Sequence, residues 1–401
     1  MKFRGLGCVL CALVPVTVFA QDADEERASG VRAGSFIISP SVSVTTGYDS
    51  NVFLQNNNQE ESFRVIIAPE LSIQSDWNRH ALVLNAGVEY GYPSHDSDDQ
   101  FLDYGASLTG VVDITREARV LASIGYLHGH EDRGSVDVPG LSAEPTETDT
   151  FNASLGAELE FNAFRVNPQV EFGYLDFEDT PLIGGGFDNQ DDRDRTELSA
   201  GLELGYEVQR GYEAFVSFNY FNTDYNDALD DTGVNRDSSG WRVLTGVNFE
   251  LTRLLEGRLG VGYAARDYSD VTLGDTSGLS LDAGLTWSPT RRMEIALDAS
   301  RDIQETTLVG ASSTQTSSIR LGTSYELLRN LSIDGALSYS NLDYEGIVRT
   351  DNIYGIELGA DWVVNRNITI SPTYLYQTRE SEQAGAGYFA HEFLVTATYV
   401  F

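Results

Sequence analysis

The chain has 401 residues, of which 41% are hydrophobic, 22% charged and 11% aromatic, and this composition excludes an intrinsically disordered protein. The formal net charge of −35 argues against a nucleic-acid-binding protein, because binding to phosphates depends on lysine and arginine, and Lys2 is the only lysine. Beyond residue 20, no stretch approaches the ~18 consecutive apolar residues of a membrane-spanning helix.

Residues 1–20 have the features of a secretory signal peptide. Lys2 and Arg4 supply positive charge at the start, residues 6–19 form a short apolar segment, and residues 18–20 offer a cleavage site with small or apolar side chains. The sequence therefore predicts export of a mature chain without these residues. A buried N-terminal helix is the alternative.

Polar and apolar side chains alternate along the rest of the chain. Clear examples are residues 196–208, 241–251 and 389–401, where every second residue belongs to the more apolar series. A period of two predicts β-strands with one apolar and one polar face. The runs are 10 to 14 residues long. That length suits tilted strands crossing a bilayer, which need about 9–11 residues, better than sandwich strands of about 5–6.

Short and long connections alternate between these strands, and the long ones, such as residues 131–149, are polar and acidic. Tight turns on one side and longer loops on the other are typical of a transmembrane barrel. After a short linker over residues 21–34, residues 35–401 are therefore predicted to form an all-β, closed antiparallel transmembrane β-barrel. Eight short turns give about 18 strands, or 16 if one hairpin is miscounted; a β-propeller is the alternative. The predicted turns lie at residues 76–79, 115–118, 162–164, 209–211, 252–256, 288–292, 328–330 and 365–367.

The two faces of the predicted strands differ in chemistry. Aromatic residues gather at strand ends on the apolar face, which suits the two interfacial belts of a barrel in a bilayer. Ordinary cross-strand pairs in a soluble sheet are the alternative. Charged side chains facing hydrocarbon would cost roughly 2–4 kcal/mol for each basic residue, so the opposite face is predicted to line a lumen in which carboxylates outnumber arginines. The candidate lining residues are Glu70, Glu89, Asp103, Glu158, Glu171, Glu203, Arg242, Glu250, Arg258, Asp282, Asp298, Arg320, Asp334 and Glu357.

The chain ends in Tyr-Val-Phe after a long alternating run. This ending resembles the terminal signal of Gram-negative outer-membrane barrels, which the barrel-assembly machinery reads, and the resemblance implies such a role for Phe393, Tyr399 and Phe401. Residues 46–53 (TGYDSNVF) resemble the opening strand of the β-barrel porin family found in exopolysaccharide-biosynthesis loci. That resemblance covers residues 35–401. It implies a location in the outer membrane of a Gram-negative bacterium and a role connected with exopolysaccharide, and it brings no catalytic residues.

The sequence predicts no enzyme and no cofactor. Both cysteines, Cys8 and Cys11, lie in the predicted signal peptide, so the mature chain would have neither a disulfide nor a thiol site. No serine and histidine have the spacing of a nucleophile with an oriented base. His128 and His130 share one face of a predicted strand as a candidate metal pair, but a solvated loop edge is the preferred interpretation, and no metal site is predicted.

Two kinds of loop segment are candidates for further roles. The acid-rich residues 188–194 and 227–231 could hold calcium through carboxylates, but they lack the spacing of a calcium loop, so solvated charge is the better interpretation. The apolar tip of the long loop 176–195 is a candidate constriction if it folds inward. Its defining residues are Leu182, Ile183 and Gly185.

The leading functional hypothesis is an outer-membrane pore associated with exopolysaccharide biosynthesis or export. A barrel of 16–18 strands leaves an aqueous channel, and an acidic lumen favours cations and neutral or weakly charged polymers over polyanions. A structural or surface-adhesion barrel with a closed lumen and a general solute porin are the alternatives. The predicted partners are the lipid bilayer, lipopolysaccharide, the barrel-assembly machinery and polysaccharide, but not nucleic acid.

Overall fold

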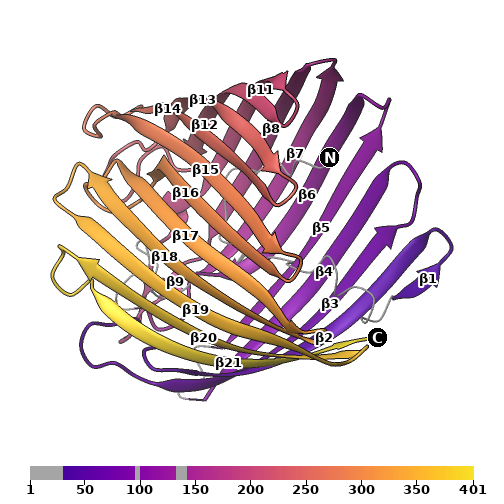
Figure 1. The fold of residues 1–401 in the computed structure, drawn as a ribbon. Helices are drawn as coiled ribbons and strands as arrows, with labels where there is room; N and C mark the ends of the chain where they lie inside the picture. Colours follow the sequence, from indigo (N-terminus) through magenta and orange to yellow (C-terminus); the bar gives the residue numbers. More distant parts are fainter. Residues whose placement is uncertain (1–29, 95–99, 132–141) are drawn as a thin grey trace.

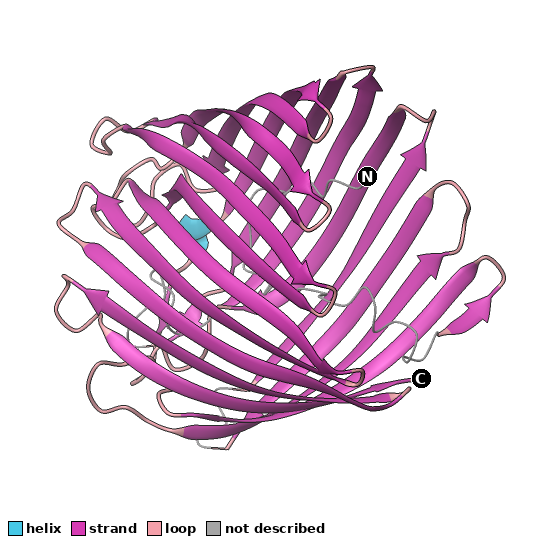
Figure 2. Ribbon diagram, viewed as in Figure 1, coloured by secondary structure: helices cyan, strands magenta, loops and turns pink. Residues whose placement is uncertain are grey.

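The computed structural model describes residues 30–94, 100–131 and 142–401. This part of the chain is almost entirely β-strand, with one short 3₁₀-helix, η3 (Asp191–Arg193), in a connection (Figure 2). Eighteen long strands form one antiparallel sheet that closes on itself (Figure 1). They are β2 (Phe36–Asp49), β3 (Ser62–Ser75), β4 (Ala81–Pro93), β5 (Phe101–Asp113), β6 (Ala118–His130), β7 (Glu147–Phe161), β8 (Phe164–Phe177), β11 (Arg195–Gln209), β12 (Tyr212–Tyr225), β13 (Ser238–Thr252), β14 (Leu255–Tyr268), β15 (Thr276–Thr290), β16 (Met293–Glu305), β17 (Ser313–Leu328), β18 (Leu331–Glu345), β19 (Thr350–Asn365), β20 (Ile368–Ser381) and β21 (Tyr388–Val400).

The sheet closes between its first and last long strands. Strand β2 pairs with β3 along one edge and with β21 along the other, in a register from Ser41↔Val400 to Asp49↔Glu392. Closure matters in lipid, because an open sheet edge would leave backbone N–H and C=O groups unpaired. The predicted 18-stranded closed barrel is confirmed, and the β-propeller alternative is excluded.

One short strand lies inside the predicted linker. Strand β1 (Val31–Ala33) pairs with the beginning of β2, in the register Val31↔Ile38 to Ala33↔Phe36. It lies along the part of β2 that extends beyond the end of β21, so its backbone continues the pairing at the barrel seam. The predicted signal peptide lies outside the described residues.

Eight short turns connect the strands at one end of the barrel, and all eight coincide with the predicted positions. Two of them show why the chain reverses there. Asn162 (φ 54°), between β7 and β8, and Gly211 (φ 82°), between β11 and β12, adopt the left-handed backbone conformation that tight hairpin turns require. The longer connections lie at the other end, and one contains the small hairpin of β9 (Thr180–Pro181) and β10 (Phe187–Asp188).

Large apolar side chains are exposed on one face of the wall. Val216, Leu259 and Val261 are each about half exposed. Contiguous apolar surface of this kind suits contact with hydrocarbon. Aromatic side chains on the same face lie at both strand ends, as predicted for interfacial belts. Examples are Tyr90, Tyr92, Tyr104, Tyr126 and Tyr220 toward the long loops, and Phe164, Tyr206, Trp287 and Trp362 toward the short turns.

No helix among the described residues has the length and apolar character needed to cross a membrane.

Candidate functional site

The polar face of the wall is the concave, inner face. Ion pairs on it join strands that are not neighbours in the sheet: Arg64 on β3 reaches Glu392 on β21 across β2, and Arg258 on β14 reaches Glu203 on β11 across two strands. Side chains converge on the inside of a closed barrel and diverge on the outside, so contacts that skip strands identify the inside. The inner face is therefore the charged one.

A five-residue ionic network lies across the inner face of β8 to β15. The Nη2 atom of Arg165 lies 2.7 Å from Glu203 Oε1 and 2.5 Å from Glu213 Oε1. The Nη2 atom of Arg258 lies 2.7 Å from Glu203 Oε2, and its Nε lies 2.8 Å from Asp282 Oδ2. Two arginines therefore hold three carboxylates. Such charge-assisted contacts orient all five side chains against one wall.

An apolar cluster lies beneath this network. Phe215 and Leu244 are each only 2% exposed, although they belong to the inner face. The Arg258 guanidinium stacks over the Phe215 ring at 3.8 Å. The ring in turn lies over Gly260, where an added Cβ would be 3.0 Å from Phe215 Cζ. The glycine lets the ring lie flat on the wall, and the arginine covers it from the other side.

Five other arginines on the inner face also form ion pairs. Each has a carboxylate partner, and most are partly exposed. The pairs are Arg64–Glu392, Arg119–Glu158, Arg242–Asp302, Arg266–Glu305 and Arg320–Glu357. The charge of these arginines is thus locally neutralised, and the same face carries further carboxylates.

All fourteen sequence-predicted lining residues lie on the strand face opposite the exposed apolar residues. The structure brings Glu203, Arg258 and Asp282 into one network, whereas Glu250 lies apart, beside the β13–β14 turn. The predicted set lacked Asp302 and Glu392 on the inner face, and Glu305, whose carboxylate reaches Arg266 from the loop end of β16. The alternation of β21 could have placed Glu392 on this face. The pairing of Arg242 with Asp302 depends on barrel curvature and carries no local sequence signal.

The long loops contain buried ion pairs. Arg193 contacts Glu131 and stacks on the Phe177 ring at 4.0 Å. Arg236 and Asp230, with side chains 5% and 3% exposed, lie 2.8 Å apart between Nε and Oδ2. Because Asp230 serves as this partner, part of the acid-rich segment 227–231 has a structural role, in addition to any solvated charge.

One buried carboxylate gives these loops a pH dependence. Asp194, between η3 and β11, is 8% exposed, and burial raises its pKa to about 7. Its Oδ1 accepts a 2.7 Å hydrogen bond from the Phe177 N–H, and this bond opposes the rise in pKa. The neighbouring Asp176 carboxyl raises the pKa of Asp194 further.

We expect the loop around Asp194 to lose stability as pH rises from about 4 to 7. The folded state keeps a proton that an unfolded aspartate, with a pKa of about 3.9, releases, so the loss is at most ~1.4 kcal/mol per pH unit. Hydrogen exchange of the Phe177 and Asn226 amides, corrected for the intrinsic rate, measures it. Asp194→Asn keeps an acceptor for Phe177 and should flatten the dependence, whereas exposed Asp227→Asn should not. An unchanged slope in Asp194→Asn would assign the pH dependence to another group.

The candidate constriction is the tip of the β9–β10 hairpin. Its base is anchored to the preceding long connection: Thr146 and Thr180 Oγ1 atoms lie 2.7 Å apart, and the Ala143 N–H donates to the Pro181 carbonyl at 2.7 Å. The tip itself is exposed, with Ile183 at 67%, beside Leu182 and the left-handed glycines Gly184, Gly185 and Gly186. Its role as a constriction stays a prediction.

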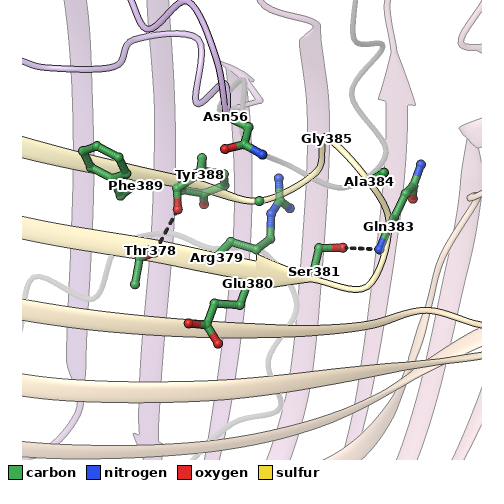
Figure 3. A pocket seen from close by; sticks show the side chains of 11 residues that line it. Asn56, Thr378, Arg379, Glu380, Ser381, Gln383, Ala384, Gly385, Tyr388 and Phe389 are labelled. Carbon is green, nitrogen blue, oxygen red and sulfur yellow. Dashed lines mark hydrogen bonds between the residues drawn. The ribbon is translucent and has the colours of Figure 1, made fainter.

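A polar cavity of about 410 Å³ lies at the loop end of β20 and β21 (Figure 3). Arg379 stacks on the Tyr388 ring at 4.7 Å and donates to the Ala386 carbonyl, and Asn56 faces it from the β2–β3 connection. An arginine, amides and an aromatic ring around a polar cavity can bind hydroxyl-rich ligands.

Two residues of the predicted assembly signal, Phe393 and Tyr399, lie on the outer face of β21, and the third, Phe401, directly follows the strand. Phe393, Tyr399 and Phe401 are exposed, and the rings of Tyr399 and Phe401 pack edge to face at 4.9 Å. They are accessible to lipid or to another protein. Recognition by the barrel-assembly machinery stays a prediction.

Comparisons with known proteins agree with this architecture. A family model described as "Putative beta-barrel porin 2" matches residues 26–401. No curated protein matches the chain. Among solved structures, the siderophore receptor PirA from Acinetobacter baumannii is similar with a TM-score of 0.50 at 8% identity, over 91% of this chain and 80% of that one. Acinetobacter baumannii OccAB4 gives 0.49 at 12% identity, over 91% and 98%. At 8% identity, the similarity to PirA speaks for the fold alone.

Proposed function

Because the chain belongs to the family of β-barrel porins whose model matches residues 26–401, we propose that it is a cation-favouring pore of the outer membrane. The observation that carries this proposal is the charge balance of the inner face, where the seven arginines of the ionic network and the five further pairs each have a carboxylate partner. Additional carboxylates such as Glu70, Glu89 and Asp298 share that face. A wall with surplus negative charge concentrates cations and repels anions.

For cargo, we propose a neutral or weakly charged exopolysaccharide, or fragments of one. The resemblance of residues 46–53 to the family of exopolysaccharide loci supports this, and so does the polar cavity lined by Asn56, Arg379 and Tyr388, which has groups suited to sugar hydroxyls. A polyanionic polymer would meet the same repulsion as other anions.

The test is ion selectivity in planar bilayers containing the purified protein. Under a KCl gradient the reversal potential should have the sign of a cation-selective pore. The triple variant Glu70→Gln, Glu89→Gln, Asp298→Asn should move that potential toward zero, because each substitution removes one inner-face charge at nearly constant size. Asp267→Asn removes a charge from the outer face of β14 and should leave it unchanged.

Other outcomes would reject the proposal in distinct ways. Anion selectivity would contradict the inner-face charge argument. The absence of conductance would favour the closed structural or adhesion barrel. If the pore were cation-selective but added neutral oligosaccharides did not change the current noise, the exopolysaccharide cargo would be rejected. The protein would then be a general solute porin.

A further inference from the structure

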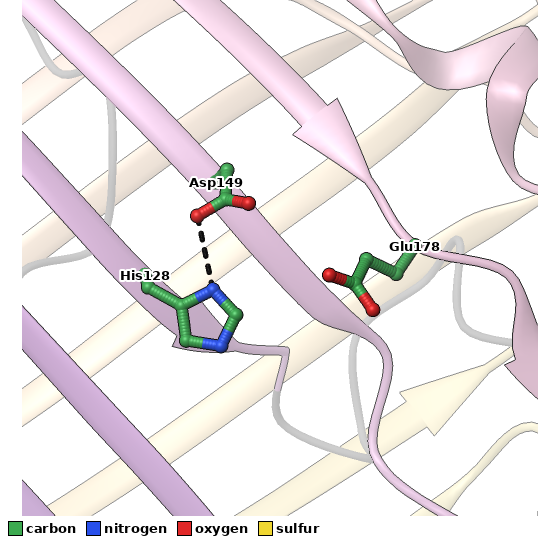
Figure 4. A group of neighbouring side chains, drawn as sticks. All are labelled: His128, Asp149 and Glu178. Carbon is green, nitrogen blue, oxygen red and sulfur yellow. Dashed lines mark hydrogen bonds and ion pairs between the residues drawn. The ribbon is translucent and has the colours of Figure 1, made fainter.

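Three consecutive strands bring metal-ligand side chains together at the loop end of the barrel. His128 on β6 is the direct cross-strand partner of Asp149 on β7. Glu178 directly follows β8, and its N–H donates to the Glu147 carbonyl at 3.0 Å, which fixes its backbone beside β7. Figure 4 shows the Glu178 carboxylate turned toward the imidazole of His128.

The three side chains are already close to a coordinating arrangement. One ligand atom from each of His128, Asp149 and Glu178 lies within 4.8 Å of the others. In a tetrahedral zinc site, N and O ligands about 2.0–2.2 Å from the metal are separated by about 3.4 Å. Glu178 is exposed and its side chain is flexible, so a movement of about 1 Å would complete the geometry.

The histidine is held in place by its surroundings. The Nδ1 atom of His128 lies 2.9 Å from Asp149 Oδ1, which also accepts a 2.6 Å hydrogen bond from the Tyr126 hydroxyl. Tyr104 stacks on the imidazole with ring centroids 4.8 Å apart. Only 13% of the His128 side chain is exposed. On the other side of the ring, Nε2 lies 3.7 Å from Glu147 Oε2, so a second carboxylate flanks the imidazole.

The neighbouring His130 does not join this group. Its Nδ1 lies 2.9 Å from Asp103 Oδ1, and its ring packs against Phe101 with centroids 4.1 Å apart and a tilt of 32°. The two histidines of the sequence motif thus have different carboxylate partners. The structure replaces the candidate His–His pair with a His–carboxylate cluster that no sequence spacing indicated.

We propose that His128, Asp149 and Glu178 bind one divalent transition-metal ion, with zinc as the best match. Imidazole nitrogen with carboxylate oxygens suits zinc, whereas calcium and magnesium prefer oxygen ligands alone. The ion would join the ends of β6, β7 and β8 on the outer side of the barrel, next to Tyr104 and Tyr126 of the aromatic belt. This inference does not depend on whether the barrel conducts ions.

The test is zinc binding to the full-length, detergent-solubilised barrel, measured by equilibrium dialysis with elemental analysis. Excess Mg²⁺ is present throughout, because it occupies the weak oxygen-only sites of this acidic surface. One tightly bound zinc per chain is expected. His128→Gln should abolish this binding, and Glu178→Gln should weaken it at least tenfold. Affinity should also fall in acid, because a protonated imidazole cannot bind zinc.

The control is His391→Gln, because His391 lies on the outer face of β21 and its Nδ1 lies 2.9 Å from the Tyr374 hydroxyl. It should bind zinc like the parent protein. Retained heat-modifiable migration on gels shows that each variant still forms the barrel. No zinc bound in the parent protein under excess Mg²⁺, or full binding in folded His128→Gln, would overturn the proposal.

Discussion

Replacing Arg236 by leucine is expected to destabilise two of the long loops by about 3 kcal/mol, the lower end of the range for removing one partner of a buried ion pair. The Arg236 guanidinium pairs with Asp230 and donates Nη1 hydrogen bonds to the carbonyls of Thr306 (3.0 Å) and Ala311 (3.3 Å). The substitution would leave the Asp230 carboxylate buried without its cation. It would also remove the link between the β12–β13 and β16–β17 connections.

Hydrogen exchange of the Val234 amide measures this loss. That N–H donates to Asp230 Oδ1 at 2.9 Å, and its exchange should accelerate about a hundredfold, since 1.4 kcal/mol corresponds to a factor of ten. Asp230→Asn in the Arg236→Leu background removes the buried charge and keeps an acceptor, so it should recover most of the protection. Arg253→Leu, at an exposed turn, is the control. If the Val234 amide exchanged equally fast in Arg236→Leu and Arg253→Leu, the buried ion pair would contribute little to loop stability.

The pH dependence of Asp230 should differ in sign from that of Asp194. Burial acts to raise the pKa of Asp230, but hydrogen bonds from Thr232 and Val234 and the Arg236 cation outweigh it, so its pKa lies below the usual range. A carboxyl with a depressed pKa stabilises the folded loop above about pH 4. That contribution is lost as pH falls through the pKa of the folded state. The two carboxylates therefore limit loop stability from opposite sides of the pH scale.

The barrel itself could be predicted from sequence because its signals are local. Alternation over 196–208 or 241–251 assigns each side chain to a face, and turn residues such as Asn162 and Gly211 mark reversals within two or three residues. Strand number follows from counting these reversals. Neither step requires knowledge of contacts between distant segments.

The inner-face contacts could not be predicted in the same way. Arg258 and Glu203 are 55 residues apart and belong to strands separated by two others. Their meeting depends on the stagger and curvature of the closed sheet. The same holds for Phe215 and Leu244, which are buried on a polar face. Arg258 and Gly260 contact the Phe215 ring, and Gly262 is the cross-strand partner of Leu244. Alternation gives the face of a residue but not its partners.

Replacing Gly262 by alanine is expected to destabilise the barrel by about 3 kcal/mol, at the upper end of the range for overpacking. Gly262 on β14 is the cross-strand partner of Leu244, and a Cβ there would overlap the Val243 carbonyl oxygen. The obstacle is backbone rather than a flexible side chain, so the two strands would have to move apart. Gly246 on β13 faces the same restriction from the Leu259 carbonyl. The pair of strands is therefore built around close backbone approach.

The measurement is urea unfolding of the refolded barrel, followed by tryptophan fluorescence and by heat-modifiable migration on gels. Gly322→Ala on β17 is the matched control, because nothing lies within 4 Å of the added Cβ. That variant should be neutral or gain up to about 1 kcal/mol, since alanine restricts the unfolded chain more than glycine does. Opposite signs at two strand glycines would show that close strand approach, rather than glycine content as such, limits substitution here. Equal stability of the two variants would mean that β13 and β14 can separate without loss, and the packed wall beneath the ionic network would then not require its glycines.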